Sequence, residues 1–199
     1  MKKERLIAFS DAVLAIIMTI LVLELAKPAA DNLAAFWELK RDFFAYALSF
    51  FWLGSLWVGL NWIWEKVERI SNAVVWWNIL LLFLASLIPY ATSLVSSHFY
   101  SKTMQGFYGV VVTLMTIVNL VLHYVLDKPN KDNKDLLETT KSYRKMLIID
   151  ILIKILALIL ALTVYPPIMM YGVLIAAVFI LSAKAVYGKK IRKSKKNNG

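Results

Sequence analysis

The sequence predicts an all-α integral membrane protein, on two observations. Of its 199 residues, 60% are hydrophobic, whereas soluble domains are about 45–50% apolar. The apolar residues gather in six blocks, at about 6–25, 43–64, 74–95, 107–126, 146–164 and 168–186. Each block is long enough to span a bilayer, and each must be helical because lipid offers no partners for backbone groups. We therefore predict one domain over residues 1–199 with six transmembrane helices.

The loops between these blocks differ in their Lys and Arg content, which sets orientation. Three such residues precede the first block, two follow the second, six follow the fourth and six follow the sixth, against four on the opposite side. Both termini are therefore expected to be cytoplasmic, and the bias explains the net charge of +10. The basic tail at 188–199 directly follows a spanning helix, so anionic lipid headgroups are its expected partner and nucleic acid is not.

When the first block is wound as a helix, its apolar and polar side chains lie on different faces. At about 100° per residue, Ile20 and Leu23 lie within roughly 40° of Ile16, as one branched apolar stripe. Thr19 flanks the stripe at roughly 60° from Ile16, and Asp11 lies roughly 140° away from it. A carboxylate in a spanning helix is costly unless it is partnered, so Asp11 is a candidate functional residue.

The second and third blocks carry polar groups that match the expected depth of Asp11. Trp57 and Asn61 lie near the cytoplasmic end of the second block, and Trp77 and Asn78 lie near the cytoplasmic start of the third. Indole and amide N–H groups are the donors that a buried carboxylate needs. We expect these residues to surround the start of the first helix.

The remaining segments are predicted from their breakers and charges. Pro89 should kink the third helix near its outer end. The stretch Ala26–Arg41 is expected to be a surface excursion. The stretch Asp127–Tyr143 is expected to be a solvated, mixed-charge linker that divides four helices from two.

The fifth block contains Asp150 and Lys154, whose i, i+4 spacing places both charges on one helix face. A structural ion pair is the favoured interpretation, ahead of a proton relay. Lys184 is expected to snorkel to the inner interface. Neither His98 nor His123 has a companion at metal-ligand spacing, so no metal site is predicted.

Several other functions find no support in the motifs. The sequence contains no cysteine, and no phosphate loop, nucleophile elbow or paired catalytic carboxylates, so we do not expect an enzyme. It also lacks the Thr-Val-Gly-Tyr-Gly loop of carbonyl-filter potassium channels.

The pattern Arg5-x-x-x-Phe9-Ser10-Asp11, placed at the start of the first of six helices, resembles the signature of the transmembrane protein 175 family. Trp77-Asn78 and Pro89-Tyr90-Ala91-Thr92 support the resemblance. Animal members of that family are lysosomal potassium channels with two six-helix repeats, whereas bacterial and archaeal members have one repeat and assemble as tetramers. The resemblance implies a homotetramer in a prokaryotic plasma membrane, around a central pore lined by the first helix.

The resemblance also implies roles for individual residues. By position, Ile16, Ile20 and Leu23 match the family's pore constriction, and Thr19 matches a threonine implicated in ion selectivity. No cofactor is implied, and potassium is only the permeant ion. The signature residues are expected to form a polar network with helices two and three, and Asn61 is the candidate to replace a histidine that many bacterial members carry on helix two. The network comprises Arg5, Phe9, Ser10, Asp11, Asn61, Trp77 and Asn78.

The leading hypothesis is thus a potassium-preferring cation channel whose apolar constriction gates by dewetting. The alternative is a secondary transporter or proton-coupled protein that uses Asp11, Asp150 and Lys154. A third possibility is a lipid-binding or assembly protein that acts through the basic tail.

Overall fold

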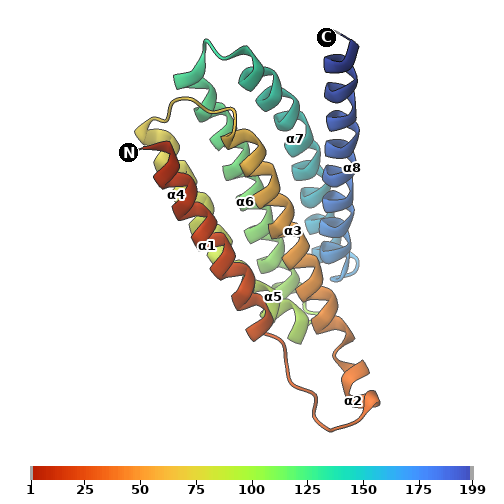
Figure 1. Ribbon diagram of the computed structural model, residues 1–199. Helices are drawn as coiled ribbons and strands as arrows, with labels where there is room; N and C mark the ends of the chain where they lie inside the picture. Colours follow the sequence, from red (N-terminus) through yellow and green to blue (C-terminus); the bar gives the residue numbers. More distant parts are fainter. Residues whose placement is uncertain (1, 198–199) are drawn as a thin grey trace.

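In the computed structural model, long helices run side by side, and the chain begins at the end of the bundle opposite the short helix α2 (Figure 1). The structure describes residues 2–197, and it describes side chains for residues 2–182. The elements are α1 (Lys3–Leu23), α2 (Leu33–Glu38), α3 (Lys40–Trp64), α4 (Asn72–Ser86), α5 (Ile88–Ser97), α6 (Lys102–Asp127), the 3-10 turn η1 (Lys128–Asn130), α7 (Lys134–Thr163) and α8 (Ile168–Asn197).

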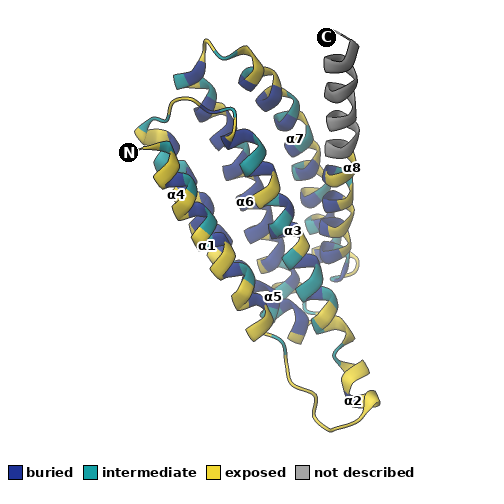
Figure 2. Cartoon of the chain, viewed as in Figure 1, coloured by how far each residue is buried: buried dark blue, intermediate teal, exposed yellow. Residues whose placement is uncertain are grey.

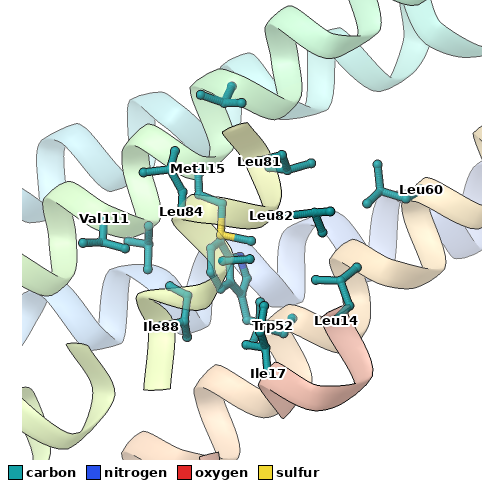
Figure 3. Close-up of a cluster of buried hydrophobic side chains, with 14 of the residues drawn as sticks. Leu14, Ile17, Trp52, Leu60, Leu81, Leu82, Leu84, Ile88, Val111 and Met115 are labelled. Carbon is teal, nitrogen blue, oxygen red and sulfur yellow. The ribbon is translucent and has the colours of Figure 1, made fainter. Parts of the chain in front are cut away.

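Helices α3 and α6 form the centre of the bundle. Helix α6 packs against α4, α5, α7 and α8, while α3 packs against α1, α5 and α8. Between them lies a core of large apolar side chains, among which Trp52 of α3 and Met115 of α6 meet Ile17 of α1 and Ile88 of α5 (Figure 3). Helix α1 packs against α3, α4 and α5 at one side of the bundle, which leaves much of its surface uncovered.

The third apolar block is broken, as predicted from its proline. Helix α4 ends at Ser86 and α5 begins at Ile88, with Pro89 in the first turn of α5. Proline lacks the N–H that would continue the ladder and clashes with the preceding turn. The two helices still form one apolar segment, Asn72–Ser97, that is long enough to cross a membrane.

The solvated linker predicted for Asp127–Tyr143 is wrong, because α7 begins at Lys134. Asn133 caps this helix by accepting the N–H of Leu136 at 3.0 Å. Leu136, Thr140 and Tyr143 are buried along one face of the added turns. Asp135, in the first turn of α7, forms an ion pair with Lys66 of the connection after α3 at 2.9 Å. The fifth helix is therefore much longer than the predicted 146–164.

The first connection also holds more structure than predicted. Within Ala26–Arg41, Asn32 accepts the N–H of Ala35 and thereby caps the short helix α2. Helix α3 then begins at Lys40, three residues before the predicted start.

Among the described residues, five segments are long and apolar enough to span a bilayer, namely Lys3–Leu23, Lys40–Trp64, Asn72–Ser97, Lys102–Asn130 and Lys134–Thr163. Of α8, the described side chains cover a shorter apolar stretch, Ile168–Ser182. A sixth crossing therefore stays a prediction. Lys184 and the side chains of the basic tail at 188–199 lie outside the described residues.

Candidate functional site

Helix α1 has one buried and one exposed face. Leu6, Ser10, Leu14, Ile17 and Leu21 are buried against the neighbouring helices. Ile16, Ile20 and Leu23 are 58%, 38% and 79% exposed in the single chain. Figure 2 shows the two faces as alternating dark and yellow bands along α1. The structure thus leaves the apolar stripe uncovered by the chain itself.

Thr19 lies on the exposed side of α1, beside this stripe. Its hydroxyl donates to the Ile16 carbonyl oxygen of the preceding turn at 2.7 Å. A hydroxyl oxygen that has donated its proton keeps lone pairs for an acceptor role. Thr19 therefore presents a hydrogen-bond acceptor, its hydroxyl oxygen, to whatever lies against this face.

Ser10 joins α1 to α4 through a buried hydrogen bond. Asn78 Nδ2 donates to Ser10 Oγ at 2.7 Å, and Ser10 Oγ in turn donates to the Leu6 carbonyl oxygen at 2.8 Å. Both side chains are buried. In an apolar environment an unmade hydrogen bond is costly, so this chain of donors fixes the rotation of α1 against α4.

Asp11 joins α1 to α3. Trp57 Nε1 donates to Asp11 Oδ1 at 2.9 Å, and the indole is 40% exposed. Ser10 and Asp11 are consecutive, so each takes a different neighbour, and together they attach the start of α1 to two helices.

The other residues expected in the polar network take no part in the Ser10–Asn78 and Asp11–Trp57 hydrogen bonds. Arg5 is exposed, Phe9 is 52% exposed, and both lie on the side of α1 that carries the stripe. Asn61 and Trp77 are half-buried. Within the part of the chain that the structure describes, no side-chain hydrogen bond is formed by Arg5, Asn61 or Trp77.

A further attachment of α1 was missed by the sequence reasoning. Lys3 Nζ donates to the carbonyl oxygen of Trp64, the last residue of α3, at 3.4 Å, and to that of Val67, three residues further on, at 2.7 Å. A lysine near a helix end commonly binds the last carbonyls of a helix, but the partner lies more than 60 residues away in sequence. No linear pattern indicates such a pair.

A second polar cluster lies deep between α3, α6 and α7. Lys154 Nζ donates to Asp150 Oδ2 and to Thr116 Oγ1, each at 2.7 Å, and lies 4.6 Å from the centre of the Trp52 ring. Both members of the ion pair are buried. Beside Asp150 is a small hollow of about 20 Å³, comparable to the room that one water molecule needs. The contacts of the pair hold α7 against α6 and α3.

The described residues contain no group of three His, Cys, Asp or Glu side chains close enough to hold a metal ion. His123 is buried, its ring stacked on Tyr143 with centroids 5.0 Å apart.

Comparison with known proteins adds family information to this geometry. Residues 5–89 match the family model described as endosomal/lysosomal potassium channel TMEM175. A protein of Chryseobacterium sp. (strain P1-3), named a potassium channel, is 34% identical over 142 residues, which cover 71% of this chain and 74% of the relative. A second protein named a potassium channel, from Streptomyces collinus, is 27% identical over 62% of this chain and 64% of the relative.

The fold also matches a solved structure. The crystal structure of a lysosomal potassium-selective channel TMEM175 homolog from Chamaesiphon minutus superposes with a TM-score of 0.70, covering 91% of this chain and 97% of that one, at 22% identity. The match supports the all-helical architecture. The descriptions of these relatives name channels, and none of them names an enzyme.

Proposed function

This chain belongs to the TMEM175 family, and from that membership we propose that it is a potassium-preferring cation channel formed by four copies of the chain. The proposed unit is one domain over residues 1–199 with six crossings, in a prokaryotic plasma membrane and with both termini cytoplasmic. No resident cofactor or metal is part of the proposal, and potassium is the permeant ion.

The observation that carries the proposal is the exposed stripe on α1. Ile16, Ile20 and Leu23 lie on a face that the chain leaves uncovered, opposite the face that packs in the bundle. One stripe on one helix covers only one side of a pore, so several copies are needed to enclose one. Four stripes that face each other would form a dry neck in which an ion loses its hydration without replacement, so the neck acts as a gate until it widens or wets.

A lipid-facing role for the stripe is the alternative, and α7 offers a comparison. The exposed residues of α7 between Ile148 and Leu162 are all apolar, as expected of a surface that meets acyl chains. The exposed face of α1 differs, since it carries Thr19 between Ile16 and Ile20 and Arg5 near its start. This polarity favours contact with an aqueous path over contact with lipid.

Small residues support assembly through the same helix. Ala8, Ala12 and Ala15 are exposed on α1, and small side chains allow neighbouring backbones to approach closely within a membrane. In the proposed tetramer, Ser10 and Asp11 anchor α1 to its own chain, while Arg5 and Phe9 face neighbouring copies or the pore mouth.

The transporter alternative has less support. Asp11 contacts Trp57, whereas the Asp150–Lys154 pair contacts Trp52. These two tryptophans project roughly 140° apart around α3. The three charges therefore do not converge on one substrate site.

The test is potassium efflux from proteoliposomes, normalised to folded tetramer. Ile16→Asn should wet the neck and raise flux, whereas Ile16→Phe should lower it. Leu152→Asn on α7 is the matched control, because Leu152 is 61% exposed and its replacement should impair yield without raising flux per tetramer. Unchanged flux in Ile16→Asn, Ile20→Asn and Leu23→Asn would remove α1 from the pore.

A further inference from the structure

A groove lies on the outside of the bundle where α3 and α8 run side by side. It has a volume of about 230 Å³, and it is lined by apolar side chains, namely Phe44, Ala47, Leu48, Phe51 and Trp52 of α3 and Leu174, Ala177, Val178 and Leu181 of α8. Two alanines, Ala47 and Ala177, stand among much larger neighbours. The missing side-chain volume at these positions leaves room between the helices.

A second hollow adjoins the groove at the end of the bundle where α3 begins. It has a volume of about 390 Å³ and is lined by Lys40, Arg41, Phe44, Phe99, Tyr100 and Tyr171. Phe44 lines both hollows. Its ring packs against those of Phe99 and Tyr171, with ring centroids 6.4 Å and 5.9 Å apart. An apolar groove is thus continuous with a pocket that is cationic and aromatic.

The cationic pocket is held in place by aromatic contacts. Arg41 Nη2 donates to the Tyr100 hydroxyl at 3.1 Å, and its guanidinium lies 4.7 Å from the Tyr100 ring centre and 5.8 Å from that of Phe99. Lys40 Nζ lies over the Trp37 ring at 5.5 Å. Within the described residues, neither Lys40 nor Arg41 forms a salt bridge, although Glu38 and Asp42 are close in sequence. Both cations therefore keep donors for an external anion.

The length of the groove fits one lipid leaflet. Phe44 and Trp52 are eight residues apart on α3, which corresponds to about 12 Å along the helix. Half of a hydrocarbon core of about 30 Å is about 15 Å. An acyl chain that starts beside Phe44 would run along the groove for most of one leaflet, with its headgroup level with Arg41.

We propose that this surface binds an anionic phospholipid, with its phosphate at Lys40 and Arg41 and one acyl chain in the groove between α3 and α8. The charge of the pocket selects this occupant over a second copy of the chain, because a phosphate satisfies both cations at once. The site lies at the opposite end of the bundle from the basic tail, and it does not depend on the chain being a channel.

The test uses the full-length protein, stripped of lipid in detergent, and native mass spectrometry. The probes are phosphatidylglycerol with two 18-carbon chains, phosphatidylcholine with the same chains, and soluble glycerol phosphate. The wild-type protein should retain phosphatidylglycerol over the other two. Arg41→Gln should weaken its binding about tenfold, a loss of about 1.4 kcal/mol, and Lys40→Gln should weaken it in the same direction. Lys27→Gln, which removes an exposed cation outside the pocket, should leave it unchanged.

The groove is tested separately by filling it. Ala47→Leu should reduce phosphatidylglycerol binding, whereas Ala73→Leu at an exposed position of α4 should not. Equal binding of phosphatidylcholine and phosphatidylglycerol, or no effect of Arg41→Gln and Lys40→Gln, would overturn the headgroup site. Glycerol phosphate that binds as well as the lipid would reduce the site to an anion pocket. If Ala47→Leu altered the oligomeric state but not lipid binding, the groove would be an interface between copies and the proposal would be wrong.

Discussion

Lys154 Nζ lies 2.7 Å from Asp150 Oδ2 inside the bundle, and both side chains are buried. Lys154 also donates to Thr116 and lies over Trp52. A buried ion pair of this kind adds little net stability over apolar residues, since desolvation offsets attraction. Removing only one partner is costly, because it leaves a charge without compensation.

We expect Lys154→Met to lower the free energy of unfolding by about 3–5 kcal/mol. The double variant Lys154→Met with Asp150→Leu should recover most of that loss. Thermal unfolding in detergent, followed by tryptophan fluorescence, measures both. Arg69→Met is the control, because Arg69 pairs with Asp132 on the surface at 3.9 Å and exposed pairs contribute about 0–1 kcal/mol.

The same double variant separates channel from transporter. If the pair only holds α7 in place, the recovered double variant conducts potassium like the wild-type protein. Loss of flux in a stable double variant would place the pair in the transport mechanism. A double variant as unstable as Lys154→Met alone would contradict the structural account of the pair.

Ser10→Ala should destabilise the protein by about 1–3 kcal/mol, because Asn78 then keeps a buried amide N–H without an acceptor. The measurement is again thermal unfolding. Ser86→Ala is the matched control, since Ser86 is exposed and its hydroxyl donates only to the Phe83 carbonyl of its own helix. Equal stabilities of the two variants would mean that the contact between α1 and α4 does not depend on this hydrogen bond.

Helical periodicity predicted much of α1, because winding alone decides which side chains share a face. It separates Ile16, Ile20 and Leu23 from Ser10, and the structure exposes the first three and buries the last. The break before Pro89 was predictable for the same local reason, since proline acts on its own turn. The exposure of Arg5 was also predictable, because Arg5 lies eleven residues before Ile16 and therefore roughly 20° from it around the helix.

Other features depend on pairs that are distant in sequence. Asn130 accepts the N–H of Arg69 at 2.9 Å and donates to the carbonyl oxygens of Arg69 and Leu126. These bonds order a stretch that, by composition, reads as a charged linker. Lys66 and Asp135 add an ion pair between segments 69 residues apart. Amino-acid composition indicates only whether each residue favours solvent. It does not indicate which distant loops contact each other.

Arg5→Ala should weaken assembly without lowering the stability of the single chain. Arg5 is exposed and forms no side-chain hydrogen bond within the described residues, so its removal leaves no orphaned partner inside the bundle. The tetramer-to-monomer ratio in size-exclusion chromatography with light scattering should fall, because the association constant drops tenfold for each 1.4 kcal/mol or so of assembly free energy that is lost. Lys2→Ala, which removes another exposed cation nearby, should change it little. A lower thermal midpoint with an unchanged ratio would assign Arg5 to the fold of one chain.

Thr19→Val should change which cation passes more than how readily the pore opens. The substitution keeps the shape and removes an oxygen, and four such oxygens would form a ring beside the apolar neck. Because the Thr19 hydroxyl already donates to the Ile16 carbonyl, its remaining lone pairs suit a cation. We expect the potassium-to-sodium permeability ratio from bi-ionic reversal potentials to fall by up to about tenfold, or about 1.4 kcal/mol.

Thr163→Val on α7 tests whether the effect belongs to the position of the hydroxyl and not to threonine in a helix. Thr163 is also exposed, and its hydroxyl makes the same kind of bond to the Ile159 carbonyl oxygen at 2.7 Å. It lies at the end of α7, whose exposed face is otherwise apolar. Its replacement should therefore leave the permeability ratio unchanged. If both valine variants kept the wild-type ratio, selectivity would have to arise from the width of the neck at Ile16, Ile20 and Leu23, because Thr19 carries the only side-chain oxygen of α1 after Asp11.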